Sequence, residues 1–290
     1  MVLWASSFVA LKLAFRDYDP MLVIFGRMAV ASLCFLPFVP CFRGGSPIRA
    51  QDLKPLLGMA LCEPCLYFIF EAKALTFTTA SQAGMITALL PLMVAVSARW
   101  ILKEVLSTQA TLGLIVAVAG ACWLSLAGKP SPAAPQPALG NLLEFLAMVC
   151  ATGYTIYLKR LTLRYRPLLL TAIQAWVGAI FFLPALFFPD TVWPQRFPWP
   201  ATLAVVYLGA VITLGAYGLY NFGVSRIPAA QASSFVNLIP VFTIAMGWLV
   251  LGERFTAGQY LAAAMVFAGI FLSQTENGIP RRNPRRTGSS

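Results

Sequence analysis

Apolar stretches alternate with short polar ones along the whole chain, and this pattern predicts ten helices. Most of the stretches hold about 20 apolar residues, the length that an α-helix needs to cross the hydrocarbon core of a membrane. The predicted segments are residues 1–15, 20–42, 54–74, 80–102, 109–127, 140–160, 168–188, 201–222, 229–251 and 257–273.

The first segment is short for a membrane crossing. Fifteen residues at about 1.5 Å rise per residue reach about 22 Å, whereas the hydrocarbon core is about 30 Å thick. We therefore expect the sequence to lack part of its first helix. A signal peptide is the alternative, but no basic residue precedes Val2 and no cleavage site is convincing.

The two halves of the chain repeat the same residues at a constant spacing. In one register the paired positions differ by 149 (240 − 91, 253 − 104), and in a second by 147 (167 − 20). The pairs include Ala80 and Ala229, Gln82 and Gln231, Pro91 and Pro240, Glu104 and Glu253, Lys12 and Lys159, and Pro20 and Pro167. We therefore predict a duplicated unit, a common plan of secondary transporters, with copies at residues 1–128 and 140–274 and a proline-rich linker at 129–139.

Each predicted copy crosses the membrane five times, so the second copy enters from the side opposite to the first. The predicted fold is thus an all-α membrane protein in which ten transmembrane helices form two inverted five-helix repeats. In such proteins the binding site lies near the membrane midplane, between the copies.

Composition excludes a soluble globular protein and disfavours an enzyme. Charged residues make up 11% of the chain, against about 25% in soluble domains, and the mean hydropathy is +0.76. The chain has no histidine, which removes Ser-His triads, His-ligated zinc and His proton relays, so no metal or cofactor is predicted. The six cysteines lie within or beside apolar runs and are predicted to be packing residues.

The net charge of +11 does not indicate a nucleic-acid partner, because the basic residues are spread over short loops. If the N-terminus is cytoplasmic, fourteen Lys and Arg residues fall in the inside loops and tail, and five fall outside, at Arg16, Lys73, Lys129, Arg196 and Arg254. The positive-inside rule then predicts that both termini are cytoplasmic. The arginine-rich tail, residues 275–290, is predicted to be disordered.

The residues at the start and end of the fourth and ninth segments resemble a known family. Ala80-Ser81-Gln82-Ala83 and Ala229-Ala230-Gln231-Ala232, followed by a central proline and a glutamate, look like the EamA domain of the drug/metabolite transporter superfamily. Trp4-Ala5-Ser6-Ser7-Phe8 resembles the opening motif of that family, and Arg27 its second-helix arginine.

This resemblance implies a ten-helix protein of the bacterial inner membrane that exports amino acids, related metabolites or cationic drugs by alternating access around a central cavity. It places the cavity among the first, third, fourth, sixth, eighth and ninth helices. The sequence departs from the family at Lys103, which replaces a glycine, and at Glu63, Glu71 and Glu144, where apolar residues are more common. The charge of the substrate therefore stays open.

Pro91 and Pro240 lie near the centres of their segments and are predicted to be hinges. Each proline removes an amide donor and frees a carbonyl four residues earlier, at Thr87 and Val236. Such carbonyls are tolerated at membrane depth only beside protein or cavity water, so we expect both kinks, with Thr87, to border the cavity. The alternative is a pair of packed kinks without a functional role.

Two amides and two carboxylates also occupy repeated positions, and we predict mainly structural roles for them. Gln82 and Gln231 are expected at opposite mouths of the cavity, where they could act as gates, although helix-to-helix hydrogen bonding is the favoured interpretation. Glu104 and Glu253 follow helices and are predicted to accept backbone N–H bonds at a helix start.

Charged residues inside apolar segments are the sharpest functional signal, because burying an ionisable group in a membrane is costly. Arg27 is expected to reach Glu63 or Glu71, either as a structural ion pair, the favoured interpretation, or as a cation that recognises a substrate carboxylate. If it is unpaired, Glu63 is a candidate to carry a coupling proton, and Glu144 belongs to the same set of charges.

Aromatic residues with polar tips complete the predicted binding site. Trp4, Tyr67, Tyr154 and Tyr217 can line a cavity that suits amino acids, aromatic metabolites or organic cations. Asn237 is a further candidate because it is polar at membrane depth.

The sequence favours an exporter of small metabolites, amino acids first, which contacts membrane lipid and exists as a monomer or homodimer. A multidrug or organic-cation exporter is the alternative within transport. A membrane scaffold or sensor without transport activity is the alternative outside it, and an intramembrane enzyme ranks third because no nucleophile and base are recognisable.

Overall fold

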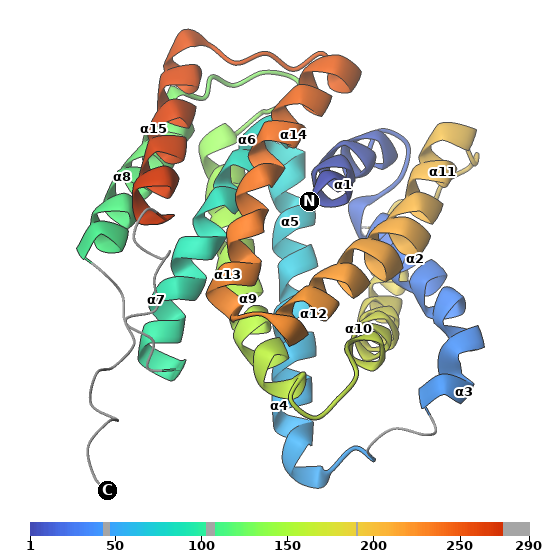
Figure 1. The fold of residues 1–290 in the computed structure, drawn as a ribbon. Coiled ribbons are helices and arrows are strands. Elements are labelled where there is room, and N and C mark those ends of the chain that lie inside the picture. Colours follow the sequence, from blue (N-terminus) through green and yellow to red (C-terminus); the bar gives the residue numbers. More distant parts are fainter. Residues whose placement is uncertain (43–46, 103–107, 190, 275–290) are drawn as a thin grey trace, which may run out of the picture.

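The computed structural model describes residues 1–42, 47–102, 108–189 and 191–274, and the regular elements within them are helices (Figure 1). Seven of these helices are long and apolar enough to cross a membrane, and three shorter apolar helices cover Val2–Ala14, Ile115–Ala127 and Ala257–Leu272. An all-helical membrane protein is therefore confirmed. Lys103, Glu104 and the tail at 275–290 lie outside the described residues.

The first half of the chain, as described, runs from α1 to α8. Its elements are α1 (Val2–Ala14), α2 (Pro20–Phe35), η1 (Leu36–Phe38), α3 (Val39–Phe42), α4 (Ala50–Ala60), η2 (Leu61–Leu66), α5 (Tyr67–Phe77), α6 (Ala80–Ile86), η3 (Thr87–Leu89), α7 (Leu90–Leu102) and α8 (Thr108–Ala127). Local signals set several starts. Asp19 caps α2 by accepting from the backbone N–H groups of Met21 and Leu22, and Pro20 occupies the first turn.

The second half runs from α9 to α15. Its elements are α9 (Pro137–Leu161), α10 (Pro167–Phe182), η4 (Leu183–Phe187), α11 (Trp199–Tyr207), η5 (Leu208–Ala216), α12 (Tyr217–Arg226), α13 (Ala229–Ser234), η6 (Phe235–Leu238), α14 (Ile239–Met246), η7 (Gly247–Leu251) and α15 (Ala257–Gln274). Because α9 begins at Pro137, the last three residues of the predicted linker are helical.

Corresponding elements of the two halves run in opposite directions in Figure 1. The chain rises from α4 to α5 in the first half and descends from α11 to α12 in the second. It likewise descends from α6 to α7 and rises from α13 to α14.

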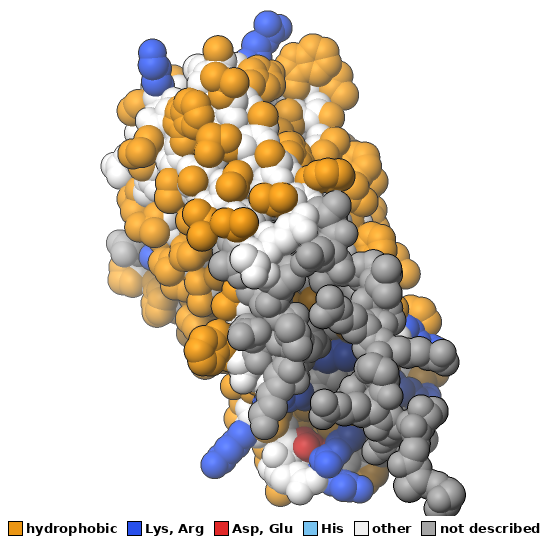
Figure 2. Space-filling model, turned by 60° about the vertical axis from the view of Figure 1, so that its left-hand side comes forward, with side chains coloured by type: hydrophobic (Ala, Val, Ile, Leu, Met, Phe, Trp, Pro, Cys, Tyr) orange, Lys and Arg blue, Asp and Glu red, His pale blue; other side chains and the backbone are white. Residues whose placement is uncertain are grey.

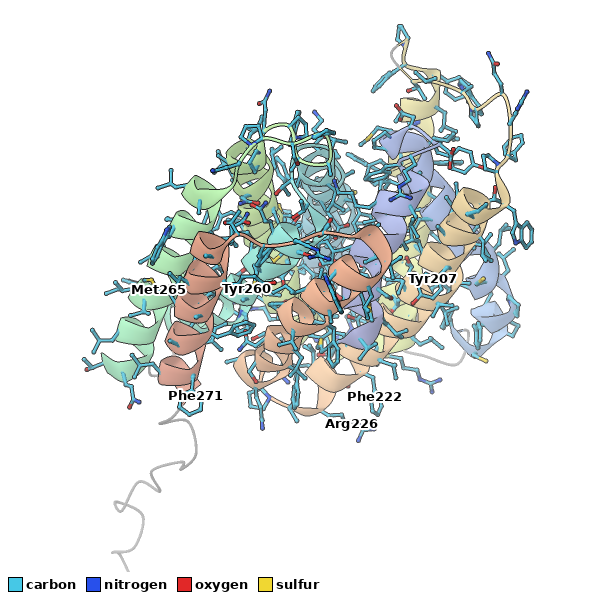
Figure 3. The ribbon with its side chains drawn as sticks, turned by 90° about the horizontal axis from the view of Figure 1, so that it is seen from above. Tyr207, Phe222, Arg226, Tyr260, Met265 and Phe271 are labelled. Atoms are coloured by element: carbon cyan, nitrogen blue, oxygen red, sulfur yellow. The ribbon has the colours of Figure 1, made fainter. Side chains whose placement is uncertain are left out.

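The last helices of the two halves, α8 and α15, pack side by side at one edge of the molecule (Figures 1 and 3). Glycines allow this close approach, since a Cβ added to Gly120 would lie 2.8 Å from the backbone nitrogen of Val266. Phe271 of α15 points outward in Figure 3 and is 74% exposed. The small residues therefore face the partner helix, and large apolar ones face away.

The outer surface is largely apolar. Hydrophobic side chains cover most of the upper part of the face drawn in Figure 2, and Lys and Arg side chains lie at its top and in its lower part. Leu126 and Phe187 are 82% and 78% exposed. Such an apolar surface is suited to contact with lipid chains.

Glu253 joins the two halves. Its Oε1 accepts from the backbone N–H of Ala80 at 2.9 Å, and its Oε2 accepts from that of Ser81 at 2.8 Å, so it caps α6. Glu253 therefore accepts backbone N–H bonds at a helix start, as predicted, and this start is that of α6, whereas α15, the next helix along the chain, is capped by Thr256 and Gln259. Gly252, with φ of 70°, makes the turn that brings Glu253 back toward α6.

Replacing Glu253 by glutamine should weaken the contact between the halves. The amide keeps one acceptor oxygen, and its NH₂ group then opposes the second backbone N–H, so we expect a loss of about 1–3 kcal/mol of stability. Thermal unfolding in detergent measures this as a lower Tm for E253Q. The control D17N removes an exposed carboxylate and should keep the parental Tm. Equal Tm values for the two variants would contradict the capping role.

Candidate functional site

A cavity lies between the two halves, with about 460 Å³ of space not filled by atoms, including the solvent at its mouth. Eight lining residues come from α1, η2, α5, η3 and α7 of the first half, and eight from α9, α12, η6 and α14 of the second. The structure brings together seven of the predicted site residues in its wall, namely Trp4, Glu63, Tyr67, Glu71, Thr87, Tyr154 and Tyr217.

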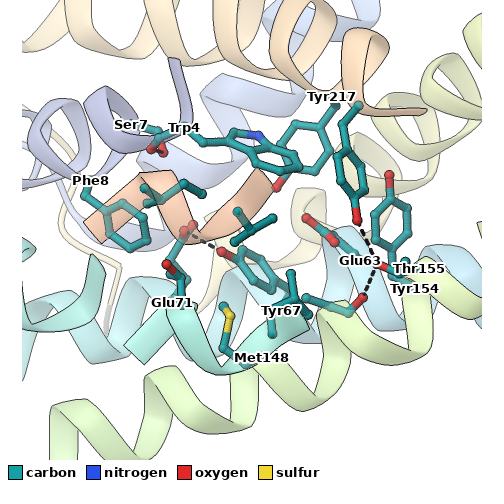
Figure 4. A pocket seen from close by; sticks show the side chains of 16 residues that line it. Trp4, Ser7, Phe8, Glu63, Tyr67, Glu71, Met148, Tyr154, Thr155 and Tyr217 are labelled. Carbon is teal, nitrogen blue, oxygen red and sulfur yellow. Dashed lines mark hydrogen bonds between the residues drawn. The ribbon is translucent and has the colours of Figure 1, made fainter. Parts of the chain in front are cut away.

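Aromatic rings form much of this wall. The Trp4 ring lies 5.1 Å from the Tyr217 ring, nearly edge to face, and 4.8 Å from the Tyr220 ring, measured between centroids. In Figure 4, Glu63 and Glu71 lie on either side of Tyr67. The wall therefore combines π faces with hydroxyl and carboxyl groups.

Helix breaks bring polar groups to the cavity. The long helix Ala50–Phe77 is interrupted at Glu63, whose φ and ψ of −150° and 118° are extended, and the following peptide bond to Pro64 is cis. A proline disfavours the helical conformation in the residue that precedes it, which accounts for a break at Glu63. A π-helical turn, η5, interrupts the equivalent long helix of the second half.

The two predicted hinges are buried, and each follows a short 3₁₀ turn. Thr87 and Leu90 beside Pro91, and Val236 and Ile239 beside Pro240, line the cavity. Both kinks thus border the cavity, as the position of the prolines predicts.

Arg27 is buried and lies behind the wall. Its Nη1 is 3.7 Å from Glu71 Oε2, its Nε donates to Thr213 Oγ1 at 2.9 Å, and its guanidinium lies 4.1 Å from the centroid of the Phe68 ring. Glu71 Oε1 accepts from the Tyr67 hydroxyl at 2.9 Å. The sequence left Glu63 and Glu71 as possible partners of Arg27, and in the structure the partner is Glu71.

A distance of 3.7 Å is longer than the ~2.7–2.9 Å of a charge-assisted hydrogen bond. Within the described part of the chain, neither Arg27 Nη1 nor Glu71 Oε2 has a hydrogen-bond partner. The two charges therefore attract each other without being saturated, and each retains the capacity to bind another group.

Four predicted site residues lie away from the cavity wall. Glu144 is fully buried in α9, and Gln82 is buried and accepts from Asn141 Nδ2 at 3.1 Å. Gln231 is exposed on α13. Asn237 is half-buried in η6, and its Oδ1 has no hydrogen-bond partner among the described residues.

A polar network beside the cavity escaped sequence reasoning. Asn221 accepts from the Tyr154 hydroxyl and donates to Thr171 Oγ1 at 2.9 Å and to Gln174 Oε1 at 3.2 Å. Gln174 Nε2 in turn donates to the carbonyl of Glu63 at 3.1 Å. The signal was present, because Gln174 and Asn221 are amides inside apolar segments.

Comparison with known proteins identifies relatives along nearly the whole chain. The model of the EamA-like transporter family matches residues 1–126 and 138–275. An uncharacterized transporter of Bacillus subtilis, YetK, is 25% identical over 98% of this chain and 87% of its own length.

Two further relatives have names that state a substrate. A probable terminal-alkyne amino-acid exporter of Streptantibioticus cattleyicolor is 24% identical over 94% of this chain and 90% of its own length. An S-adenosylmethionine/S-adenosylhomocysteine transporter of Chlamydia trachomatis is 26% identical over 93% and 85%. A solved crystal structure shares the fold, with a TM-score of 0.64 and 18% identity over 94% of each chain.

Replacing Asn221 by alanine should destabilise the protein, because it leaves the buried polar groups of Tyr154, Thr171 and Gln174 without this partner. Each unsatisfied group costs about 1–3 kcal/mol. We expect a lower Tm for N221A in detergent. A matched control is N237A, since no hydrogen bond is lost at the Asn237 oxygen. A Tm for N221A as high as that of N237A would contradict the role of the network.

Proposed function

The chain belongs to the EamA-like transporter family, and from that premise we propose that it is a secondary transporter of small molecules that carry an α-amino acid group. It would work by alternating access in a bacterial inner membrane, in the direction of export, with both termini in the cytoplasm. The observation that carries the proposal is the cavity, whose wall comes equally from the two halves and holds carboxyl groups and aromatic rings.

Ten crossings in two inverted repeats are the architecture that we propose for this transporter. The opposite directions of corresponding helices in Figure 1 support it. Contacts between elements also occur in matching pairs. They are α1 with α11 and α9 with α4, α2 with η5 and α10 with η2, α1 with α14 and α9 with α7, and α6 with α14 and α13 with α7.

The charges at the cavity fit a zwitterionic group. We assign the substrate ammonium to Glu63, which faces the cavity next to Tyr217. The substrate carboxylate would bind Arg27 and replace Glu71 there, which the loose 3.7 Å contact favours. Trp4, Tyr67 and Tyr154 would contact the rest of the molecule.

The names of two relatives agree with this substrate class. An amino-acid exporter and an S-adenosylmethionine/S-adenosylhomocysteine transporter act on molecules that differ in size but share an α-amino acid group. A cavity that recognises this shared group at its charged end would accept both kinds of substrate.

Movement between inward-open and outward-open states would bend the helices at Pro91 and Pro240, where 3₁₀ turns already interrupt the α-helical hydrogen bonds. Gln82 and Gln231 would then lie near opposite mouths. Gln82 is buried and Gln231 exposed, which would fit one closed and one open mouth.

An organic-cation exporter is the second candidate. Among the described residues, Arg27 is the buried base and four acids are buried, of which Glu63, Glu71 and Glu144 have no basic partner other than Arg27, whereas Asp52 pairs with Arg164. An excess of carboxyl groups favours a cationic substrate without a carboxylate of its own.

Counterflow in proteoliposomes tests the substrate class. The labelled panel is phenylalanine, leucine, S-adenosylmethionine and tetraethylammonium. Exchange of the first three above empty liposomes, without tetraethylammonium, is the expected result. Exchange of tetraethylammonium alone would support the second candidate, and exchange of none would contradict both transport functions.

Glu63→Gln should weaken amino-acid binding, because the neutral amide loses a charge-assisted hydrogen bond of about 1.5–3 kcal/mol to the ammonium. The half-saturation concentration in counterflow should rise about 10- to 100-fold. The control D52N alters an acid of α4 that pairs with Arg164 and Tyr165, away from the cavity wall. An unchanged half-saturation concentration for E63Q would remove Glu63 from the site.

A further inference from the structure

We propose that Asn141 closes one end of the binding cavity as a gate, through hydrogen bonds to Thr78, Gln82 and Ser125. We name these four residues the gate cluster. This inference rests on the proposed transport function, and it adds the contact that must break before a substrate can pass that end of the cavity.

Asn141 holds the gate cluster together with both the oxygen and the NH₂ group of its amide. Its Oδ1 accepts from Thr78 Oγ1 at 2.8 Å, and its Nδ2 donates to Gln82 Oε1 at 3.1 Å and to Ser125 Oγ at 3.2 Å. The three partners belong to the first half, at the end of α5, in α6 and in α8, whereas Asn141 lies in α9 of the second half. One side chain therefore joins four helices across the two halves.

The gate cluster lies next to the cavity wall along the helices that form the wall. On α9, Asn141 and the wall residue Met148 are seven residues apart (148 − 141), so they share one face of the helix and lie about 10 Å apart along its axis. Thr78 follows the wall residue Glu71 by the same number of residues (78 − 71), and α6, which carries Gln82, leads directly into η3 of the wall. A molecule that leaves the cavity between α5, α6 and α9 must therefore pass the gate cluster.

The gate cluster is shielded from solvent in the structure. Thr78 is 0% exposed, Asn141 1% and Gln82 3%. The start of α9 lies tightly against the end of α5, because a Cβ added to Gly140 would lie 2.6 Å from the Cβ of Thr78. The end of α8 covers Gln82, since a Cβ added to Gly128 would lie 3.1 Å from the Gln82 Oε1. The end of the cavity next to the linker is therefore closed.

The repeat-related positions at the opposite end differ from the gate cluster. The offset of 149 pairs Gln82 with Gln231 and Thr78 with Ile227. The backbones of the second pair agree, with φ and ψ of −128° and 171° at Thr78 and of −128° and 162° at Ile227. Gln231, however, is exposed, and Ile227 has no hydroxyl to donate. The two ends therefore share a backbone plan, and the hydrogen-bonded closure belongs to the end next to the linker.

A hydrogen-bonded contact suits a gate that opens and closes. When the helices separate, water can replace the partners of the amide and hydroxyl groups, so the net loss for each hydrogen bond is small. An apolar contact would instead expose hydrophobic surface to water at each opening. The 3₁₀ turn η3 joins α6 to α7 beside Pro91, so bending at this proline would move Gln82 away from Asn141. The same movement would open a path to the cavity.

A reversible cross-link tests whether the gate cluster must open during transport. In a variant without the six native cysteines, T78C/N141C places two thiols where the native side chains are 2.8 Å apart. Oxidation with copper phenanthroline should form a disulfide and abolish phenylalanine counterflow, and dithiothreitol should restore it. Each single variant should show no loss on oxidation. Counterflow by the cross-linked protein would mean that the contact is static, and failure to cross-link would mean that the two side chains do not meet. Either result would overturn the proposal.

Labelling of a cavity cysteine tests the gate without any transport measurement. T87C, in the background without native cysteines, is exposed to a membrane-impermeant thiol reagent in vesicles of both orientations, so that the result does not depend on the proposed topology. From the side of the linker, T78V and N141A should each raise the labelling rate about 10-fold, because the closed form loses at least one hydrogen bond.

T78V keeps the shape of the side chain, so its result does not depend on whether N141A folds. The matched control N237A should leave the rate unchanged, since no hydrogen bond is lost at the Asn237 oxygen. Equal rates for T78V, N141A and the parental T87C protein would overturn the proposal. If the wild type shows no counterflow, the proposed function fails, whereas the labelling rates still decide whether Asn141 closes this end of the cavity.

Discussion

Burial of ionisable side chains in an apolar bundle is the constraint on which the rest of this structure depends. Lipid cannot stabilise a charge, so Arg27, Glu63, Glu71 and Glu144 must be balanced by one another, by cavity water or by a ligand. The structure places Arg27 against Glu71 and opens a cavity beside Glu63. An apolar replacement of all four would remove this cost, which makes their presence hard to explain by packing alone.

Several irregular parts of the helices lie around the same charges. The break at Glu63 and Pro64, the π-helical turn η5 and the 3₁₀ turns before Pro91 and Pro240 lie at or near the cavity. Side chains satisfy backbone groups freed there. Gln174 of α10 donates to the carbonyl of Glu63, and within η5 Thr213 donates to the carbonyl of Leu208. At these positions irregular backbone and buried charge occur together, where the two halves meet.

Much of this arrangement could be predicted from the sequence. Apolar length gave the helices, and the constant spacing of Pro91 and Pro240 marked positions that border the cavity. The aromatic residues with polar tips, Trp4, Tyr67 and Tyr217, also lie where expected. These positions could be predicted because helix formation in a membrane and the loss of an amide at proline are local properties.

The remaining features depend on how helices pair across the halves, which a periodic pattern does not encode. The helix capped by Glu253 belongs to the other half, and the choice of Glu71 over Glu63 by Arg27 depends on rotation about helix axes. Gln82 and Asn237 both carry a polar amide inside an apolar segment, but their surroundings differ. Gln82 accepts a hydrogen bond from Asn141, whereas the Asn237 oxygen has no such partner in the described residues.

The central claim, a water-filled binding cavity between the halves, is tested most directly by thiol labelling. In a variant without the six native cysteines, T87C, which lines the cavity, should react with a small cationic thiol reagent, and phenylalanine should slow the reaction. A121C, which is similarly buried but lies in α8 outside the cavity wall, should not react. A T87C side chain as unreactive as A121C would contradict the account.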